Sequence, residues 1–108
     1  DLRRMAQKII ALRIFEDENE KMNLSALDLN KDICIVSQFT LYGDCSQGRR
    51  PNFMEAASPD KAEKLYDYFI KEINKCDLNI ATGQFKAMMD VDFLNDGPVT
   101  LLMNSEER

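Results

Sequence analysis

Histidine is absent from this 108-residue sequence, and its absence limits the possible chemistry more than any other feature. Histidine is the usual general base near neutral pH and the commonest zinc ligand in proteins. Ser-His-Asp and Cys-His catalysis are therefore excluded within the chain, and a zinc hydrolase would have to use cysteine and carboxylate ligands alone. An enzyme built from this sequence must work through carboxylates, hydroxyls, backbone amides, a cofactor or the substrate itself.

Cysteine, long apolar runs and known phosphate-binding motifs are also scarce. Cys34, Cys45 and Cys76 are too few and too scattered for a disulfide framework or a zinc knuckle, which indicates a reducing cytoplasm. No apolar run approaches the ~20 residues that a membrane-spanning helix needs. The sequence contains no glycine-rich phosphate loop, nucleophile elbow or calcium loop. We therefore expect no metal, no cofactor and no membrane contact.

Acidic residues outnumber basic ones, 19 to 14, which gives a formal net charge of −5. This sign is opposite to that of proteins that coat phosphate backbones, so any contact with nucleic acid must be local. The length and the 44% hydrophobic share predict one globular domain over residues 1–108. Because the chain opens within an amphipathic pattern and has no signal-peptide features, we expect the natural start to lie upstream of Asp1.

Apolar spacing predicts two helices and a series of strands. Residues 2–10 have helical periodicity, and a second helix begins after Ser58 as its cap and carries an apolar stripe that includes Tyr66 and Phe69 as core residues. The predicted strands are a buried one from Ile33 to Gly43 and three further runs at 78–82, 89–93 and 99–103. This order predicts an α+β domain in which helices pack on a mostly antiparallel sheet.

Two polar segments are not fully explained by these elements. Ser37, Gln38 and Thr40 interrupt a strand predicted to be buried, where they form either a structural network or a polar pocket. Residues 95–100 fit an ordinary hairpin turn, or a cis Gly97-Pro98 bond that would fix the direction of two carbonyls. Composition and spacing alone favour the structural interpretation of both segments.

Together, the two segments resemble the two signature motifs of the D-aminoacyl-tRNA deacylases. The motifs are SQFTLYGD, which begins at Ser37, and NDGPVT, which begins at Asn95. Further matches in family order are LRIFED at 12–17, MNLS at 22–25, GRRP at 48–51, and TG at 82–83 followed by Phe85 and Met89. The resemblance covers nearly the whole chain, but the first strands of the family's sheet have no counterpart in it.

The resemblance implies a homodimeric cytoplasmic enzyme with a barrel-like, mostly antiparallel sheet and two packed helices. Such an enzyme hydrolyses the ester between a D-amino acid, or mischarged glycine, and the terminal adenosine of tRNA, and it spares the L-ester. The implied substrate-binding residues are Phe85 and Met89 near the adenine, and Gly97 and Pro98. In this picture the Gly97-Pro98 bond is cis and enters the partner's pocket, where its carbonyls bind the amino group and exclude an L side chain.

The implied catalytic segment comprises Ser37, Gln38, Phe39 and Thr40. Backbone N–H groups of Phe39 and Thr40 would polarise the ester carbonyl, with Ser37 and Gln38 supporting the oxyanion region. Thr40 could instead be the nucleophile, but the chain has no histidine to activate its hydroxyl. We therefore expect the 2'-hydroxyl of the terminal ribose to position or activate a water molecule.

Three basic residues are also of interest for the predicted site. Arg49 and Arg50, in a loop with glycine and proline, are candidate contacts to the acceptor end of the tRNA. Lys86 stands where a small residue is common in the family, and its side chain either enters the adenine site or points to solvent.

The alternatives to the deacylase function are an inactive nucleic-acid or protein interaction module of the same fold and a hydrolase of another small ester. The presence of both motifs favours the deacylase.

Overall fold

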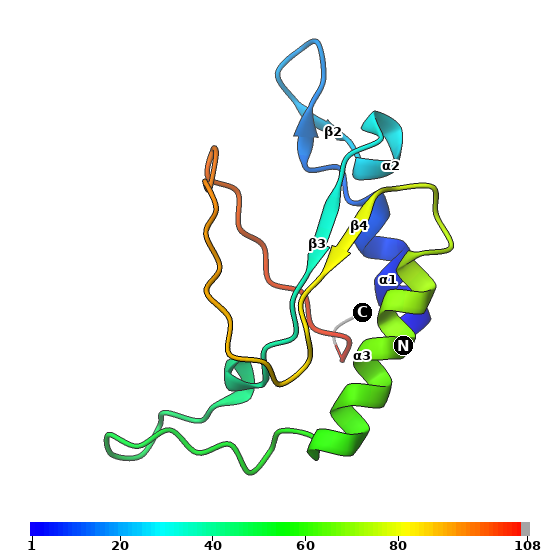
Figure 1. Ribbon diagram of the computed structural model, residues 1–108. Helices are drawn as coiled ribbons and strands as arrows, with labels where there is room; N and C mark the ends of the chain where they lie inside the picture. Colours follow the sequence, from blue (N-terminus) through cyan, green and yellow to red (C-terminus); the bar gives the residue numbers. More distant parts are fainter. Residues whose placement is uncertain (107–108) are drawn as a thin grey trace.

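In the computed structural model, which describes residues 1–106, two long helices lie beside a short pair of strands (Figure 1). The elements in chain order are α1 (Leu2–Ala11), β1 (Phe15–Glu16), β2 (Met22–Leu24), α2 (Ala26–Leu29), β3 (Ile33–Ile35), the 3₁₀ helix η1 (Phe39–Tyr42), α3 (Pro59–Ile73) and β4 (Ile80–Thr82). Helix α1 packs against both α2 and α3. The predicted α+β class is confirmed.

Helix α3 forms where the sequence predicts it, because its start is well specified. The Ser58 hydroxyl accepts a hydrogen bond from the Lys61 N–H across 3.4 Å, Pro59 occupies the first turn, and Asp60 lies at the positive end of the helix dipole. Helix α1 is also confirmed. The shorter α2 has a capping box, in which the Ser25 hydroxyl and the Asp28 carboxylate each accept from the other's backbone N–H.

The strands form two separate pairs. Strands β1 and β2 are antiparallel, whereas β3 and β4 are parallel, with Ile33 opposite Ile80 and Ile35 opposite Thr82. The mostly antiparallel sheet predicted from the sequence therefore holds only for the β1–β2 hairpin. The central pair is parallel because the long connection between its strands contains α3, which is the crossover that parallel strands require.

The prediction of one strand from Ile33 to Gly43 is wrong beyond Ile35. The last backbone bond of the pair runs from the Gly83 N–H to the Ile35 carbonyl at 2.8 Å. Residues 39–42 then turn into η1, which the Gly43 N–H closes by donating to the Thr40 carbonyl at 3.0 Å. The Phe39 ring leaves the strand direction to pack edge-on against Phe53, with 5.3 Å between ring centroids.

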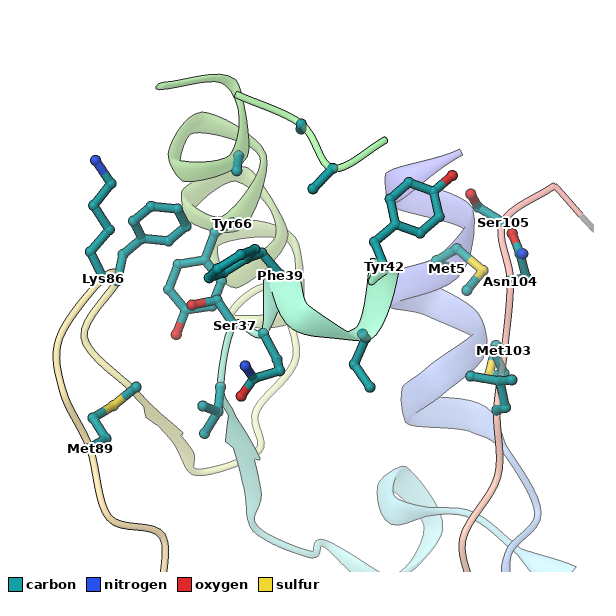
Figure 2. Close-up of a pocket in the computed structure, with 18 of the residues that line it drawn as sticks. Met5, Ser37, Phe39, Tyr42, Tyr66, Lys86, Met89, Met103, Asn104 and Ser105 are labelled. Carbon is teal, nitrogen blue, oxygen red and sulfur yellow. The ribbon is translucent and has the colours of Figure 1, made fainter. Parts of the chain in front are cut away.

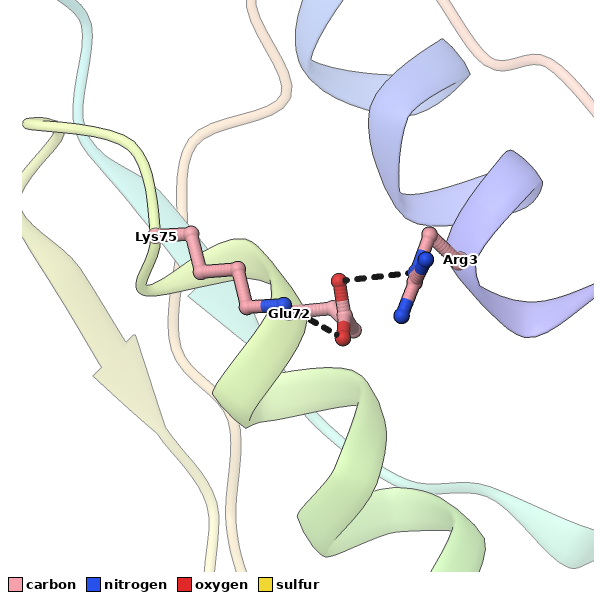
Figure 3. A network of polar contacts seen from close by, with 3 residues as sticks. All are labelled: Arg3, Glu72 and Lys75. Carbon is pink, nitrogen blue, oxygen red and sulfur yellow. Dashed lines mark hydrogen bonds and ion pairs between the residues drawn. The ribbon is translucent and has the colours of Figure 1, made fainter.

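A small core and an ion-pair cluster join the two long helices. Ala6, Ile73 and Leu78 are the buried apolar side chains of residues 1–106. Beside them, the Glu72 carboxylate lies 2.9 Å from Lys75 Nζ and 3.8 Å from Arg3 Nε, and only 7% of the Glu72 side chain is exposed (Figure 3). This cluster links α1 to the last turn of α3.

Residues 88–103 extend from the body as an irregular arm that turns back on itself (Figure 1). The strands predicted at 89–93 and 99–103 do not form, because no neighbouring strand within residues 1–106 offers them backbone partners. Large apolar side chains of the arm are exposed, including Met88 at 99%, Leu94 at 89% and Leu102 at 93%. Across the described part of the chain, no helix has the length and apolar character needed to cross a membrane.

Candidate active site

A cavity of about 1070 Å³ opens where the β3–β4 pair ends, between η1, α3 and the start of the arm (Figure 2). Its lining includes five residues of the predicted site, namely Ser37, Gln38, Phe39, Phe85 and Met89. These residues come from two segments more than forty positions apart in the sequence, which the parallel pairing of β3 with β4 brings together. The structure thus joins the two parts of the site that the sequence analysis predicts separately.

The lining is largely apolar, with a few hydrogen-bonding side chains. Apart from the polar groups already named, it includes Tyr42, Tyr66, Asn104 and Ser105. Such a surface suits a planar base together with one polar group that must be oriented. Residues 1–106 contain no group of three or more cysteine or acidic side chains that could hold a metal ion.

Thr40 does not line the cavity, but it is linked to it through Gln38. The Gln38 side-chain amide donates to the Thr40 hydroxyl, with 2.5 Å between Nε2 and Oγ1. Phe39 and Thr40 are the first two residues of η1, so their N–H groups have no acceptor within that helix. Backbone donors are therefore available beside the cavity, as the sequence analysis expects of an oxyanion site.

Besides Thr40, four predicted site residues lie outside the cavity lining. Gly97 and Pro98 belong to the arm, and the peptide bond between them is cis, with Gly97 at a φ of 113°. Arg49 and Arg50 are exposed in the loop after η1. The stem of that loop is closed by paired backbone hydrogen bonds of 2.7 and 2.9 Å between Asp44 and Asn52.

The sequence analysis missed several residues of the cavity. Tyr66, predicted as core, exposes one face of its ring to the cavity while its hydroxyl reaches the ends of β3 and β4. Because Tyr66 lies on the apolar stripe of its helix, the sequence predicted a core residue. Only its polar hydroxyl indicated that it could also have a polar contact. Met5, Met103 and Ser105 come from the two ends of the described chain, and no local pattern connects them.

Lys86 lines the edge of the cavity, next to Phe85 (Figure 2). Its backbone has a φ of 64°, in the left-handed region where residues with a Cβ are disfavoured. The side chain is exposed and runs outward from the cavity edge, so it borders the site and also reaches solvent (Figure 2). Only glycine would adopt this φ without a steric cost.

A family model and curated relatives identify the family of this chain. The family model for D-Tyr-tRNA(Tyr) deacylase matches residues 1–104. A D-aminoacyl-tRNA deacylase from Halothermothrix orenii is 57% identical over 108 residues, which are 100% of this chain and 72% of that protein. One from Bacillus cytotoxicus is 62% identical over 102 residues, covering 94% of this chain and 70% of the relative. A solved structure described as c-Myc DNA Unwinding Element Binding Protein has a TM-score of 0.88 at 39% identity, over 97% of this chain and 72% of that one.

Proposed function

Because the chain belongs to the D-Tyr-tRNA(Tyr) deacylase family, we propose that its cavity receives the acceptor end of D-aminoacyl-tRNA. The protein is an ester hydrolase that acts on D-aminoacyl-tRNA and releases the free D-amino acid and tRNA. One observation supports the cavity as the place of this reaction. Residues of the SQFT motif and of the segment around Phe85 and Met89, far apart in the sequence, line the same cavity.

The proposed reaction is the attack of water on the ester carbonyl. A water oxygen adds to the carbonyl carbon, the bond to the ribose oxygen breaks, and a proton passes to that ribose oxygen. The backbone N–H groups of Phe39 and Thr40 stabilise the developing negative charge, and a well-placed donor of this kind contributes about 3 kcal/mol. The neighbouring 2'-hydroxyl of the terminal ribose positions or activates the water, which accounts for a site without histidine.

The adenine of the substrate binds beside Phe85 and Met89. The Phe85 ring packs against the Tyr66 ring, with 5.9 Å between the ring centroids. This contact supports the Phe85 ring, which can offer an apolar surface to a base. Ser37 and Gln38 line the same cavity, and the ester would lie near them, beyond the ribose. Mischarged glycyl-tRNA fits this arrangement, because glycine has no side chain for the site to reject.

Selection against L-aminoacyl esters requires a second copy of the chain in this proposal. The Gly97-Pro98 segment of one protomer enters the cavity of its partner, where its carbonyls bind the amino group and leave no room for an L side chain. Two observations support this arrangement: Gly97 and Pro98 do not line the cavity of their own chain, and the arm that carries them exposes large apolar side chains. In the homodimer these side chains are covered, and the arm completes a barrel-like sheet.

Contact with the tRNA itself is assigned to Arg49 and Arg50. Both are exposed in a loop next to η1, in a chain whose overall net charge is −5. A small basic surface is enough for an enzyme that holds only the acceptor end. A substrate of this kind places the enzyme in the cytoplasm, and the proposed reaction needs neither metal nor cofactor.

A nucleic-acid interaction module without activity is the second candidate. It is favoured by the similar solved structure, which is named as a protein that binds a DNA unwinding element. The two candidates differ in turnover, since a module binds nucleic acid without cleaving an ester.

The deciding experiment is a deacylation time course of the full-length protein with D-tyrosyl-, L-tyrosyl- and glycyl-tRNA. The D-ester is expected to react at least about 100-fold faster than the L-ester, a difference of about 2.7 kcal/mol in activation free energy. Equal rates for the D- and L-esters, or no hydrolysis of any of the three, would contradict the proposal. Tight tRNA binding without hydrolysis would favour the interaction module, and equal activity on a simple phenyl ester would favour a general esterase.

A further inference from the structure

The Tyr66 hydroxyl lies at the point where the parallel strand pair ends. Its oxygen is 2.7 Å from the Gly83 carbonyl oxygen and 3.1 Å from the Ile35 carbonyl oxygen. A hydroxyl has one proton to donate, so the two carbonyls share it, with the shorter contact to Gly83. The Ile35 carbonyl also accepts from the Gly83 N–H at 2.8 Å. Tyr66 therefore contacts the last backbone hydrogen bond that joins the two strands.

Both strands continue from this point directly into the cavity. Ser37 follows Ile35 by two residues, Phe85 follows Gly83 by two residues, and both line the cavity (Figure 2). Beyond the bond between Gly83 and Ile35, the described residues show no further backbone hydrogen bond between the two segments. The distance between the segments is therefore set at their common origin, where the Tyr66 hydroxyl lies.

The tyrosine side chain is well suited to this place. Its ring packs against Phe85, its hydroxyl reaches both carbonyls, and helix α3 provides a rigid support. Burial raises the pKa of Tyr66, so the hydroxyl stays protonated at neutral pH. Without the Tyr66 hydroxyl, the Gly83 carbonyl would lose its hydrogen-bond donor, and the half-buried end of the strand pair would lose its hydrogen bonds to α3.

We propose that Tyr66 is a positioning residue for the deacylation reaction, which fixes the spacing between the Ser37 segment and the Phe85 segment of the cavity. This inference rests on the proposed function, in which the ester lies near the first segment and the adenine near the second. The Tyr66 hydroxyl is occupied by two backbone carbonyls and does not contact the substrate. Its effect reaches the reaction through the relative placement of two groups that must act on one molecule.

The variant Tyr66→Phe tests this role because it keeps the ring and removes only the hydroxyl. With D-tyrosyl-tRNA, kcat/KM is expected to fall between about 10- and 100-fold, since a displacement of about 1 Å has effects of this size. The affinity for AMP, which occupies only the adenine side, is expected to change less than about twofold. Tyr68→Phe, on the same helix and outside the cavity lining, is the matched control and should leave both values unchanged.

Two further measurements separate a positioning role from a loss of folding. Thermal denaturation gives the folded fraction, by which the rates are corrected, and amide hydrogen exchange should accelerate at residues 36–38 and 84–87 in Tyr66→Phe alone. A Tyr66→Phe protein whose corrected kcat/KM stays within about twofold of wild type, or whose AMP affinity falls as much as its kcat/KM, would overturn the inference. Wild-type protein that hydrolyses none of the aminoacyl-tRNAs would overturn the proposed function and this inference together.

Discussion

The Gln38 side-chain amide donates to the Thr40 hydroxyl oxygen across 2.5 Å. An N–H directed at this oxygen occupies one of its two lone pairs and makes the oxygen a weaker nucleophile. No histidine exists in the chain to remove the hydroxyl proton. The pair is therefore better suited to shaping the turn at the cavity edge than to covalent catalysis.

Thr40→Ala is expected to retain most of the deacylation activity. Its kcat should stay within about twofold of wild type, which is a change of less than about 0.4 kcal/mol in activation free energy. The measurement is single-turnover hydrolysis of D-tyrosyl-tRNA by protein of verified fold. Complete loss in Thr40→Ala, with activity retained in Thr40→Ser, would instead identify Thr40 as the nucleophile.

Gly97→Ala is expected to lower the preference for D- over L-esters by at least about tenfold, or about 1.4 kcal/mol. At a φ of 113° an alanine is strained, and its Cβ would lie 3.2 Å from the Val99 nitrogen and 3.3 Å from Val99 Cγ2, so the segment has to move. The ratio of kcat/KM for the D-ester to kcat/KM for the L-ester measures this preference. Gly48→Ala is the control, because its φ of 67° carries a similar backbone cost with nothing within 4 Å of the added Cβ. An unchanged ratio in Gly97→Ala would argue against the role of this segment.

Replacing both Arg49 and Arg50 by alanine is expected to raise KM for aminoacyl-tRNA and leave kcat unchanged. Each lost phosphate contact should reduce the slope of log KM against log salt by roughly 0.7. The control is Lys61→Ala with Lys64→Ala, which removes the same charge from exposed positions on α3. Equal KM values and equal salt slopes in the two double variants would show that the two arginines do not contact the substrate.

Lys86→Gly is expected to stabilise the fold by about 0.5 to 1 kcal/mol, because glycine adopts a φ of 64° without the cost that a Cβ imposes. The midpoint of urea denaturation measures the change. Glu20→Gly, at a φ of 61° in an exposed turn, should gain a similar amount away from the cavity. A lower midpoint for Lys86→Gly alone would show that the contacts of the lysine side chain outweigh the backbone cost.

The Glu72 cluster predicts a loss of stability in acid. The hydrogen bond from Lys75, together with the charges of Lys75 and Arg3, holds the pKa of Glu72 below its ordinary value of 4.5. A carboxyl group with a lowered folded-state pKa adds stability above its unfolded pKa and loses it as the pH falls through the folded value. Urea denaturation between neutral and acid pH should therefore show a smaller decline for Glu72→Gln than for wild type. Glu63→Gln, exposed on the same helix, should follow wild type.

Helices α1 and α3 and the motif residues could be predicted, because the information that specifies them is local. The Ser58 cap and the apolar stripe define α3, and the SQFT segment and the pair Phe85 and Met89 identify the family and its cavity. In contrast, the end of β3 at Ile35 depends on where β4 stops pairing with it, which no pattern within residues 33–43 contains. Tyr66 escaped prediction for the same reason, since its two acceptors are 17 and 31 residues away in the sequence.

The unpaired arm shows another limit of sequence patterns. Met89, Val91 and Phe93 alternate with aspartates as in a strand with one buried face, yet all of this segment is exposed in the single chain. Alternation states which side of a strand is apolar but does not identify the surface that covers it. In the proposed homodimer, the partner provides that surface.

The backbone bonds between Asp44 and Asn52 have a geometric consequence for substrate choice. Only three peptide units separate Arg49 from Asn52, which belongs to this closed stem. The Cα atom of Arg49 therefore stays within roughly 11 Å of the Cα atom of Asn52. In the proposed complex, guanidinium groups held at such short reach would contact phosphates of the acceptor end. An enzyme that contacts only this end of the tRNA would not need to read the anticodon, and it could then act on tRNAs for different amino acids.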